Sequence, residues 1–323
     1  MRRARVLCWH VHGSWMTSFV AGDRDHLIPT TRPDDPWGRG RAGRPWPSSA
    51  MEVSPSELRH ADIDVAVVQR AQELDLVRRW TGRRPGVDIP VVYVEHNTPT
   101  DHAATTRHPV AHRDDIPLVH VTHTNALMWD NGLAPVRVVE HGIADPGHRY
   151  TGELPRAATM INEPRRRWRI TGTDLLAPIA RGAPVDLWGI DTDGIGTTGR
   201  TTGLDGVVGY GDVPAPALHE AVARRRVYVH TARWTSLGLS LIEAMAMGMP
   251  VVAVAATEAV TIPPEAGTVS AVPAELAEAA AALVDDPTTA ELRGKVARTW
   301  ALDRFGLDRF TREWDTLLAE VIR

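Results

Sequence analysis

The sequence has very little cysteine and lysine, and it has no long apolar run. Its one cysteine, Cys8, excludes a disulfide bond within the chain and fits a reducing compartment. Only one of the 36 lysine and arginine residues is a lysine, Lys295, so any anion site must use arginine or backbone N–H groups. No apolar stretch approaches the roughly 20 residues that a transmembrane helix requires. The sequence therefore predicts a chain without a disulfide bond or a membrane-spanning helix.

The charge of the chain excludes another class of partner. The formal net charge of −4 provides no electrostatic basis for binding nucleic acid. The first residues, MRRARVLCWHVHG, have arginines before a short apolar stretch but no small-residue cleavage site, so we expect no signal peptide. We expect a soluble cytoplasmic protein, for which peripheral membrane contact remains open. The preference for arginine is typical of a GC-rich, actinobacterial-type genome.

Short runs rich in valine and isoleucine alternate with helix-like segments, which is typical of parallel sheets with both faces covered. The expected strands are residues 4–11, 26–31, 64–70, 89–98, 116–125, 136–142, 157–161, 185–189, 206–210, 226–230 and 250–255. The expected helices are residues 54–61, 71–82, 173–181, 214–224, 238–247, 273–284 and 288–302. The first of these helices begins with Ser54 and Glu57 at capping-box spacing.

The length of 323 residues and the break in this pattern favour two domains. Residues 142–156 have linker composition, so we expect an N-terminal domain over 1–145 and a C-terminal domain over 150–304. The last segment, 307–323, has one apolar face and is expected to form a helix that crosses back to the first domain. The predicted fold is α/β, with two doubly wound Rossmann-like domains whose ligands bind beyond the carboxyl ends of the strands.

One stretch of the second domain, RVYVHTARWTSLGLSLIEAMAMGMPVVAVAATE (226–258), carries a chemical signature. A strand leads into a Ser-Leu-Gly turn, a helix follows, and Pro250 opens the next strand. Gly238 allows the backbone to approach a ligand closely, and the first free N–H groups of the helix can bind a diphosphate. Glu243, one turn into the helix, can accept hydrogen bonds from the two vicinal hydroxyls of a ribose. The alternative is that Glu243 is a solvated helix residue.

Residues 236–254, with Gly-Leu, an acid and then Ala-Met-Ala-x-Gly-x-Pro-Val-Val, resemble the donor site of GT-B glycosyltransferases of the family-4-like, group 1 retaining type. The resemblance implies a GT-B fold, in which two Rossmann-like domains face a cleft. It also implies a nucleotide-diphosphate sugar as the donor substrate. By this resemblance Glu243 binds the ribose, and the backbone of Ser236, Leu237, Gly238 and Leu239 holds the diphosphate.

The chain departs from the family pattern at two charged positions. Thr235 stands where the family has a first acid that contacts the donor sugar, so we take Thr235 as the expected catalytic position there. Thr171 stands where a lysine is expected to clamp the diphosphate. Four arginines at 165–167 and 169 precede it, and we expect Arg167 and Arg169 to replace the lysine. The alternative is a solvated basic loop.

The resemblance implies further contacts with the donor at the two ends of the Gly- and Thr-rich segment 189–212. The family places base and ribose contacts near Gly189 and Tyr210. The Asp-Thr-Asp at 191–193 is a weak candidate for a metal site, because family members neutralise the leaving phosphate with helix dipoles and basic residues. We therefore expect neither an obligatory metal nor a cofactor.

Candidate residues of the first domain follow its expected strands. His96 matches a family histidine near the donor sugar, and we expect it to contact the sugar or the transition state. The resemblance implies that the loop with Gly13 borders the acceptor and the donor phosphate, and His12 and His102 are expected acceptor or cleft residues. His10 alternates with His12, so a metal pair is a further alternative there.

Three other features of the first domain were considered. His141 occupies the asparagine position of the family's interdomain hinge and is expected to shape a turn. Cys8 lies inside a strand and is expected to be inert. The loop at 32–50 contains Trp37 and Trp46, which either cover the acceptor or pack at the edge of the core.

These observations predict a hexosyltransferase. It would move a sugar from a nucleotide-diphosphate donor to a small-molecule, glycan or glycolipid acceptor, with retention implied by the resemblance alone. The departing phosphate can accept the acceptor's proton, so no protein base is obligatory. Loss of the first acid and of the lysine keeps two alternatives open, a non-catalytic nucleotide-sugar-binding protein and a GT-B nucleotide-sugar epimerase.

Overall fold

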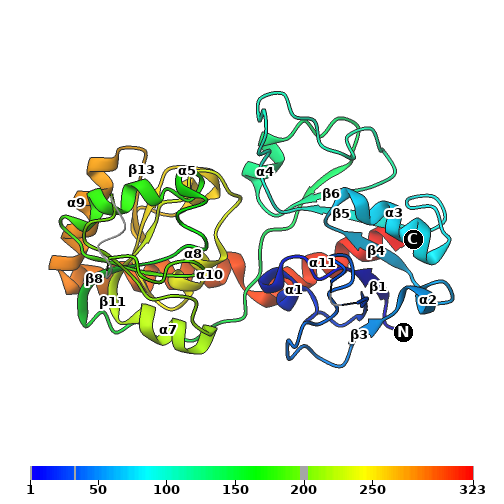
Figure 1. Cartoon of the computed structure of the whole chain (residues 1–323), viewed down its shortest axis with the longest axis horizontal. Helices are drawn as coiled ribbons and strands as arrows, with labels where there is room; N and C mark the ends of the chain where they lie inside the picture. The colour runs from blue at the N-terminus through cyan, green and yellow to red at the C-terminus, as the bar shows by residue number, and fades with distance from the viewer. Residues whose placement is uncertain (1, 33, 197–202, 323) are drawn as a thin grey trace. The chain divides into compact units, whose positions relative to one another are not determined.

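The structure, a computed structural model, describes residues 2–32, 34–196 and 203–322. The chain divides into two compact units. Unit 1 comprises Met1–Ile143 together with Leu307–Arg323, and unit 2 comprises Ala144–Gly306. The last segment of the chain therefore belongs to the same unit as the first, and each unit is described by itself below (Figure 1).

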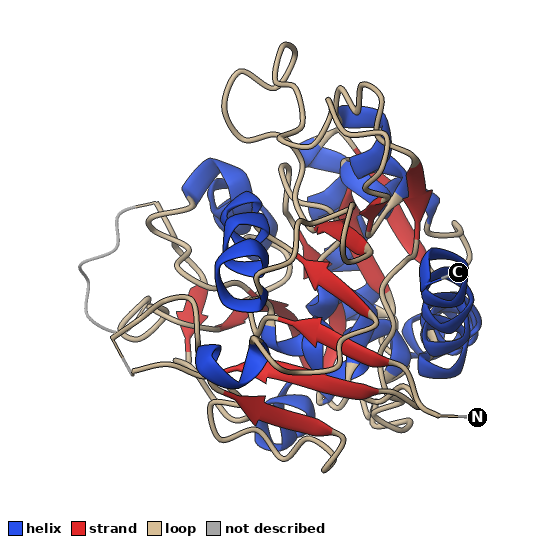
Figure 2. Ribbon diagram, turned by 90° about the vertical axis from the view of Figure 1, so that its right-hand side faces the viewer, coloured by secondary structure: helices blue, strands red, loops and turns tan. Residues whose placement is uncertain are grey.

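Unit 1 is built on a sheet of seven parallel strands in the order β3-β2-β1-β4-β5-β6-β7. Its strands are β1 Arg5–Cys8, β2 Asp25–Pro29, β3 Ala50–Val53, β4 Val65–Val68, β5 Val91–Glu95, β6 Leu118–His120 and β7 Val136–Val138. Its helices are α1 Gly13–Phe19, α2 Pro55–Leu58, α3 Ala71–Thr81, α4 His123–Met128 and α11 Leu307–Ile322. Figure 2 shows strands side by side with helices outside them.

The C-terminal helix α11 forms part of the core of unit 1. Its apolar face, Phe310, Trp314, Leu317 and Leu318, is buried in a cluster with the valines of β1, β4, β5 and β6. The ring of Trp314 meets that of Trp15 in α1 edge to face, with centroids 5.8 Å apart. The helical spacing of these residues in the sequence thus marks the face that the helix buries.

Unit 2 is built on six parallel strands in the order β10-β9-β8-β11-β12-β13. Its strands are β8 Leu154–Met160, β9 Val185–Trp188, β10 Val207–Gly209, β11 Arg225–His230, β12 Val251–Val254 and β13 Gly267–Ser270. Its helices are α5 Trp168–Thr171, η1 Thr173–Leu175, α6 Leu176–Ala180, α7 Ala215–Ala223, α8 Leu239–Ala246, η2 Thr257–Thr261, α9 Pro273–Asp285 and α10 Pro287–Phe305. One face of the sheet packs on α6 and α9, through Leu176, Ile179, Leu276 and Leu283.

Several elements differ from the sequence-based expectation. The strand expected over 116–125 ends at His120, and α4 begins at His123 because the Thr122 hydroxyl accepts a hydrogen bond from the N–H of Asn125 (3.0 Å). The helix expected over 173–181 starts as the 3₁₀ turn η1 before it becomes α6. The elements α1, β3, α5 and β13 were not anticipated. The predicted capping box of Ser54 and Glu57 is confirmed, since each accepts from the other's backbone N–H.

A helix that crosses a bilayer must be both long and apolar. In the described ranges of the chain, no helix is both apolar enough and long enough to cross a membrane.

The packing of α11 leads to a stability prediction. We expect Trp314→Ala to lower the free energy of unfolding of unit 1 by about 3–5 kcal/mol, because it leaves a cavity beneath Trp15 and Phe19. Urea unfolding followed by tryptophan fluorescence and circular dichroism measures the change. The exposed Arg312→Ala on the same helix is the control and should stay within about 0.5 kcal/mol. Equal stability of the two variants would show that α11 is not part of the core.

Candidate functional site

The predicted donor-site residues of unit 2 follow the carboxyl ends of four strands, β8, β9, β10 and β11. In the observed strand order, β8 and β11 are neighbours, and the chain leaves them toward opposite halves of the sheet. Such a topological switch point is where doubly wound sheets bind their ligands. The loops after β8, β9, β10 and β11 contain the predicted residues Arg167, Arg169, Gly189, Tyr210 and 235–238. The topology thus brings these residues to one edge of one sheet.

The turn between β11 and α8 has an open helix N-terminus. Gly238 is the N-cap residue of α8, it makes no side-chain cap, and the first turn contains no acid. A Cβ atom at Gly238 would lie 2.7 Å from Cε1 of the buried His230, so the backbone packs directly on that ring. Ser236 and Leu237 are buried, while Gly238 and Leu239 are half-buried. The first N–H groups of α8 are therefore available to an anion.

Glu243 lies one turn further along α8 and is partly accessible. Its side chain is 27% exposed, and its Oε2 lies 3.4 Å from Nε2 of His219 in the neighbouring helix α7. Glu243 is therefore more than a solvated helix residue, because one of its oxygens has a defined partner. Three residues earlier in α8, the Ser240 hydroxyl contacts the Tyr228 hydroxyl of β11 (3.0 Å).

The loop after β8 packs against the loop after β11. Gly172 has a left-handed backbone (φ +67°), and a Cβ there would overlap the carbonyl oxygen of Thr231. The Thr231 hydroxyl donates to the carbonyl of Thr171 (2.8 Å). Thr171, at the position of the expected lysine, is buried and its hydroxyl contacts that of Thr173 (2.9 Å). The position that a lysine would occupy is thus part of the packing between the two loops.

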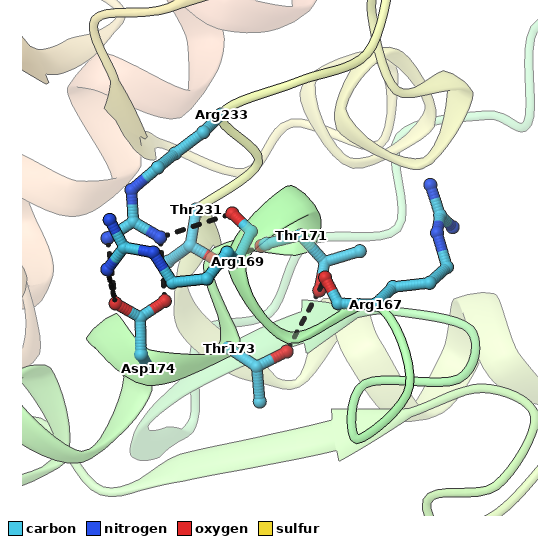
Figure 3. A network of polar contacts seen from close by, with 7 residues as sticks. All are labelled: Arg167, Arg169, Thr171, Thr173, Asp174, Thr231 and Arg233. Atoms are coloured by element: carbon cyan, nitrogen blue, oxygen red, sulfur yellow. Dashed lines mark hydrogen bonds and ion pairs between the residues drawn. The ribbon is translucent and has the colours of Figure 1, made fainter. Parts of the chain in front are cut away.

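An ion-pair network joins the same two loops (Figure 3). Asp174 accepts from Arg233 at 2.6 and 3.0 Å and from Arg169 at 2.7 Å. Partial burial acts to raise the pKa of Asp174, but the hydrogen bonds and charges of the two arginines outweigh it and lower the pKa. The sequence-based prediction included Arg169 but missed Arg233. Its position in the loop after β11, three residues before Ser236, was the available signal.

The other arginines of the loop after β8 have separate surroundings. Arg166 pairs with Glu163, and Arg165 donates to the carbonyl of Asp191 (3.2 Å). Figure 3 shows the side chain of Arg167 extending away from the Asp174 network. Within the described ranges, its guanidinium donates no hydrogen bond to another residue, so Arg167 is the cation of this loop most available to a ligand.

Gly189 and Tyr210 lie at the ends of β9 and β10. Gly189 has φ +134°, and a Cβ there would overlap the carbonyl oxygen of Ile161 at the end of β8. The ring of Tyr210 is 45% exposed and stacks on Trp188 with centroids 5.1 Å apart and planes at 17°. Gly189 and Tyr210 thus follow neighbouring strands of the sheet. Their contacts with the base and the ribose of a donor stay predictions.

The predicted residues of unit 1 come from two neighbouring regions of its sheet edge. His12 and Gly13 start α1, and His96 follows β5; the rings of His12 and His96 lie 4.1 Å apart. Trp15 meets His96 edge to face at 5.1 Å. Burial lowers the pKa of His96 and also that of His12. His102 is separate from this pair, since it is exposed in a turn with φ +48°.

The loop at 32–50 packs on unit 1. Trp46 is buried, and its Nε1 donates to the Thr17 hydroxyl of α1 (3.0 Å). Trp37 is partly buried beneath the guanidinium of Arg70, which lies 4.3 Å from the ring centroid. This favours core-edge packing over an acceptor cover for the two tryptophans.

The two histidines of the candidate metal pair, His10 and His12, contact different neighbours. His10 turns toward the loop, with Nδ1 2.9 Å from the carbonyl oxygen of Gly40, while His12 faces His96. Among the residues that the structure describes, no three His, Cys, Asp or Glu side chains are grouped so that they could hold a metal ion.

Comparisons with known proteins identify the class of fold. Residues 194–286 match the family model of glycosyl transferases group 1. No curated protein matches the chain in sequence.

Solved glycosyltransferase structures match the whole chain. Sucrose-phosphate synthase from Thermosynechococcus elongatus is 16% identical, with a TM-score of 0.71 over 98% of this chain and 99% of that one. Anabaena Alr3699/HepE in complex with UDP is 13% identical, with a TM-score of 0.75 over 99% and 100%. The lipopolysaccharide outer core galactosyltransferase WaaB is 11% identical, with a TM-score of 0.68 over 99% of each chain.

The fold is therefore the GT-B fold of glycosyltransferases, made of two Rossmann-like units with parallel sheets. Residues 194–286, which match the model of glycosyl transferases group 1, include the β11–α8 turn and Glu243.

The Asp174 network leads to a second prediction. We expect Asp174→Asn to destabilise unit 2 by about 1–3 kcal/mol, because two arginines then lose a shared charged acceptor. Since the pKa of Asp174 is lowered in the fold, its contribution is present above pH 4 and is lost as the pH falls through the folded pKa. Urea unfolding at pH 7 measures the loss. Arg166→Ala removes an exposed pair on the same loop, and a loss as large as that of Asp174→Asn would contradict the assigned role of the network.

Buried histidines of unit 1 lead to a third prediction. Burial lowers the pKa of His26 and of His141 to about 3 and that of His120 to about 4. Below pH 6.5 the unfolded chain binds protons that the fold excludes, so stability must fall with the pH. We expect a loss of about 1.4 kcal/mol per pH unit for each of them, from pH 6.5 down to the folded pKa. Urea unfolding at pH 7.5 and 5.5 measures it.

The control separates buried from exposed imidazoles. His26→Leu should reduce the difference between the two pH values, and the exposed His112→Gln should leave it unchanged. Equal stability of the wild type at both pH values would refute the prediction.

Proposed function

We propose that this chain is a glycosyltransferase that moves a hexosyl group from a nucleotide-diphosphate sugar to an acceptor bound by unit 1. The observation that carries the proposal is the open N-terminus of α8 at the switch point of unit 2, with the partly exposed carboxylate of Glu243 one turn behind it. An uncapped helix start suits a diphosphate, and a carboxylate with one unoccupied oxygen suits the hydroxyls of a ribose.

Three further observations support this assignment. The group 1 model covers the turn, and Anabaena Alr3699/HepE, which is similar in fold, was solved with UDP and with UDP-glucose. The cations Arg167, Arg169 and Arg233 lie in the two loops that flank the turn. The side chains around it thus provide positive charge without lysine.

The proposed chemistry is mainly electrostatic. As the bond from the sugar to the diphosphate breaks, negative charge grows on the leaving phosphate. The amides of α8 and the guanidinium of Arg167 would stabilise that charge in a preorganised setting. We propose retention of the anomeric configuration, with the leaving phosphate accepting the proton of the acceptor hydroxyl. His96 and Thr235 are the proposed contacts of the sugar, and no metal or separate cofactor is part of this scheme.

A nucleotide-binding experiment tests the proposal. UDP, GDP, ADP and dTDP are added to the full chain, and the melting temperature of unit 2 is followed. A nucleotide at about 100 times its Kd should add about 2.7 kcal/mol of stability. Glu243→Gln should abolish most of this gain, because a neutral amide is a weaker acceptor for the ribose hydroxyls. Glu278→Gln, on the exposed side of α9, is the matched control and should retain the gain.

Turnover then distinguishes the remaining functions. Release of free sugar or transfer to an acceptor from UDP-, GDP- or dTDP-sugars supports a transferase. Binding without turnover, with candidate acceptors supplied, would instead favour a non-catalytic binder, for which the uncharged Thr235 is the supporting observation. Interconversion of donors without an acceptor would identify an epimerase.

A further inference from the structure

One contact of the candidate site lies outside the run of sequence that resembles a donor site. His219 belongs to α7, and its Nε2 lies 3.4 Å from Oε2 of Glu243 in α8. The two side chains are 17% and 27% exposed, so both are reachable from solvent. A neutral imidazole can donate from Nε2 to the carboxylate, and a protonated one can do so with charge.

This contact makes the two carboxylate oxygens of Glu243 different from each other. Oε2 faces the imidazole, whereas Oε1 has no hydrogen-bond partner among the residues that the structure describes. A glutamate on a helix surface loses rotamer freedom when it is ordered, and this loss opposes binding. A side chain that is already held by a neighbour has less of this freedom left to lose on binding. Glu243 is thus partly ordered before any ligand arrives.

We propose that His219 is a positioning residue that holds Glu243 with Oε1 toward the ribose, so that the site selects nucleotides with sugar hydroxyls over 2′,3′-dideoxynucleotides, which have none. This inference rests on the proposed function, because it assigns Glu243 to the ribose of the donor. A held carboxylate oxygen accepts well from the 2′- and 3′-hydroxyls, and a nucleotide without them leaves that oxygen unpaired. The competing role is purely structural, with the pair only joining α7 to α8.

The chain allows a matched pair of substitutions at this position. In His219→Gln, the amide nitrogen lies the same number of bonds from Cβ as Nε2 of histidine does, so it still reaches Glu243. In His219→Asn, the same amide is one bond shorter and does not reach. The two variants share their chemistry and differ in reach, and His219→Ala removes the donor altogether.

Calorimetric titration of the full chain with nucleotides tests the role. UDP, GDP and ADP are each compared with their 2′,3′-dideoxy counterparts, and the ratio of the two Kd values is the readout. We expect a ratio of at least about tenfold for the wild type and for His219→Gln. We expect less than about threefold for His219→Asn and His219→Ala. The change should lie in the Kd of the ribonucleotide, while the Kd of the dideoxynucleotide stays the same.

Other outcomes overturn the inference in distinguishable ways. If His219 has a purely structural role, its loss would weaken the binding of both nucleotides equally and leave the ratio of the two Kd values unchanged. The melting temperature and the circular dichroism spectrum of each variant would show such a structural effect. Equal ratios in His219→Gln and His219→Asn would also refute positioning by a hydrogen bond. If Glu243→Gln loses the ratio while His219→Asn keeps it, only the positioning role fails. If the wild type binds neither these three nucleotides nor dTDP, the proposed function fails and this inference fails with it.

Discussion

The candidate donor site depends on the absence of a side chain at Gly172. Its left-handed backbone lies so close to the carbonyl oxygen of Thr231 that no Cβ fits between them. This closeness lets the N–H groups of Arg233 and Trp234 both donate to the carbonyl of Ile170 (2.9 and 3.2 Å). The loop after β11 is thereby held against the loop after β8, and it determines where α8 begins. The helix amides, Glu243 and the arginines keep their relative positions as a consequence.

The sequence contained most of the information for the sheets and for this helix. Parallel strands that are buried on both faces read as continuous apolar runs, so β11, β12 and the helix between them were expected at 226–230, 250–255 and 238–247. The strand order was not predicted, because the right-handed crossover rule determines the face on which a connecting helix packs and not which strand lies beside which. Placing residues 235–239, Gly189 and Tyr210 at one edge needed only the rule that doubly wound sheets bind ligands beyond the carboxyl ends of their strands, together with the resemblance.

The elements that the sequence did not reveal are those whose cause is tertiary. Helix α1 begins at Gly13 without a side-chain cap, and it is stabilised by burying Trp15 and Phe19 against α11, some 300 residues further along the chain. Strand β13, GTVS, is an edge strand with a single large apolar residue, so its periodicity is weak. Arg233 and His219 escaped notice for the same reason. A pattern within one segment shows which face is buried, but it does not show which side chain of another segment will meet it.

The replacement of lysine by arginine changes how the site can hold a diphosphate. The two loops and α8 contain three anions, Glu163, Asp174 and Glu243, and five arginines, which leaves two net positive charges; the arginines are Arg165, Arg166, Arg167, Arg169 and Arg233. A planar guanidinium can satisfy Asp174 with one edge and still present N–H donors on another, which a compact ammonium group does less well. Asp174 therefore holds Arg169 and Arg233 in place, and its negative charge offsets one of their two positive charges. In the proposed reaction the leaving diphosphate gains negative charge as its bond to the sugar breaks, and the first N–H groups of α8 are placed to stabilise that added charge. The uncapped, acid-free start of α8 is therefore the central feature of the proposed site.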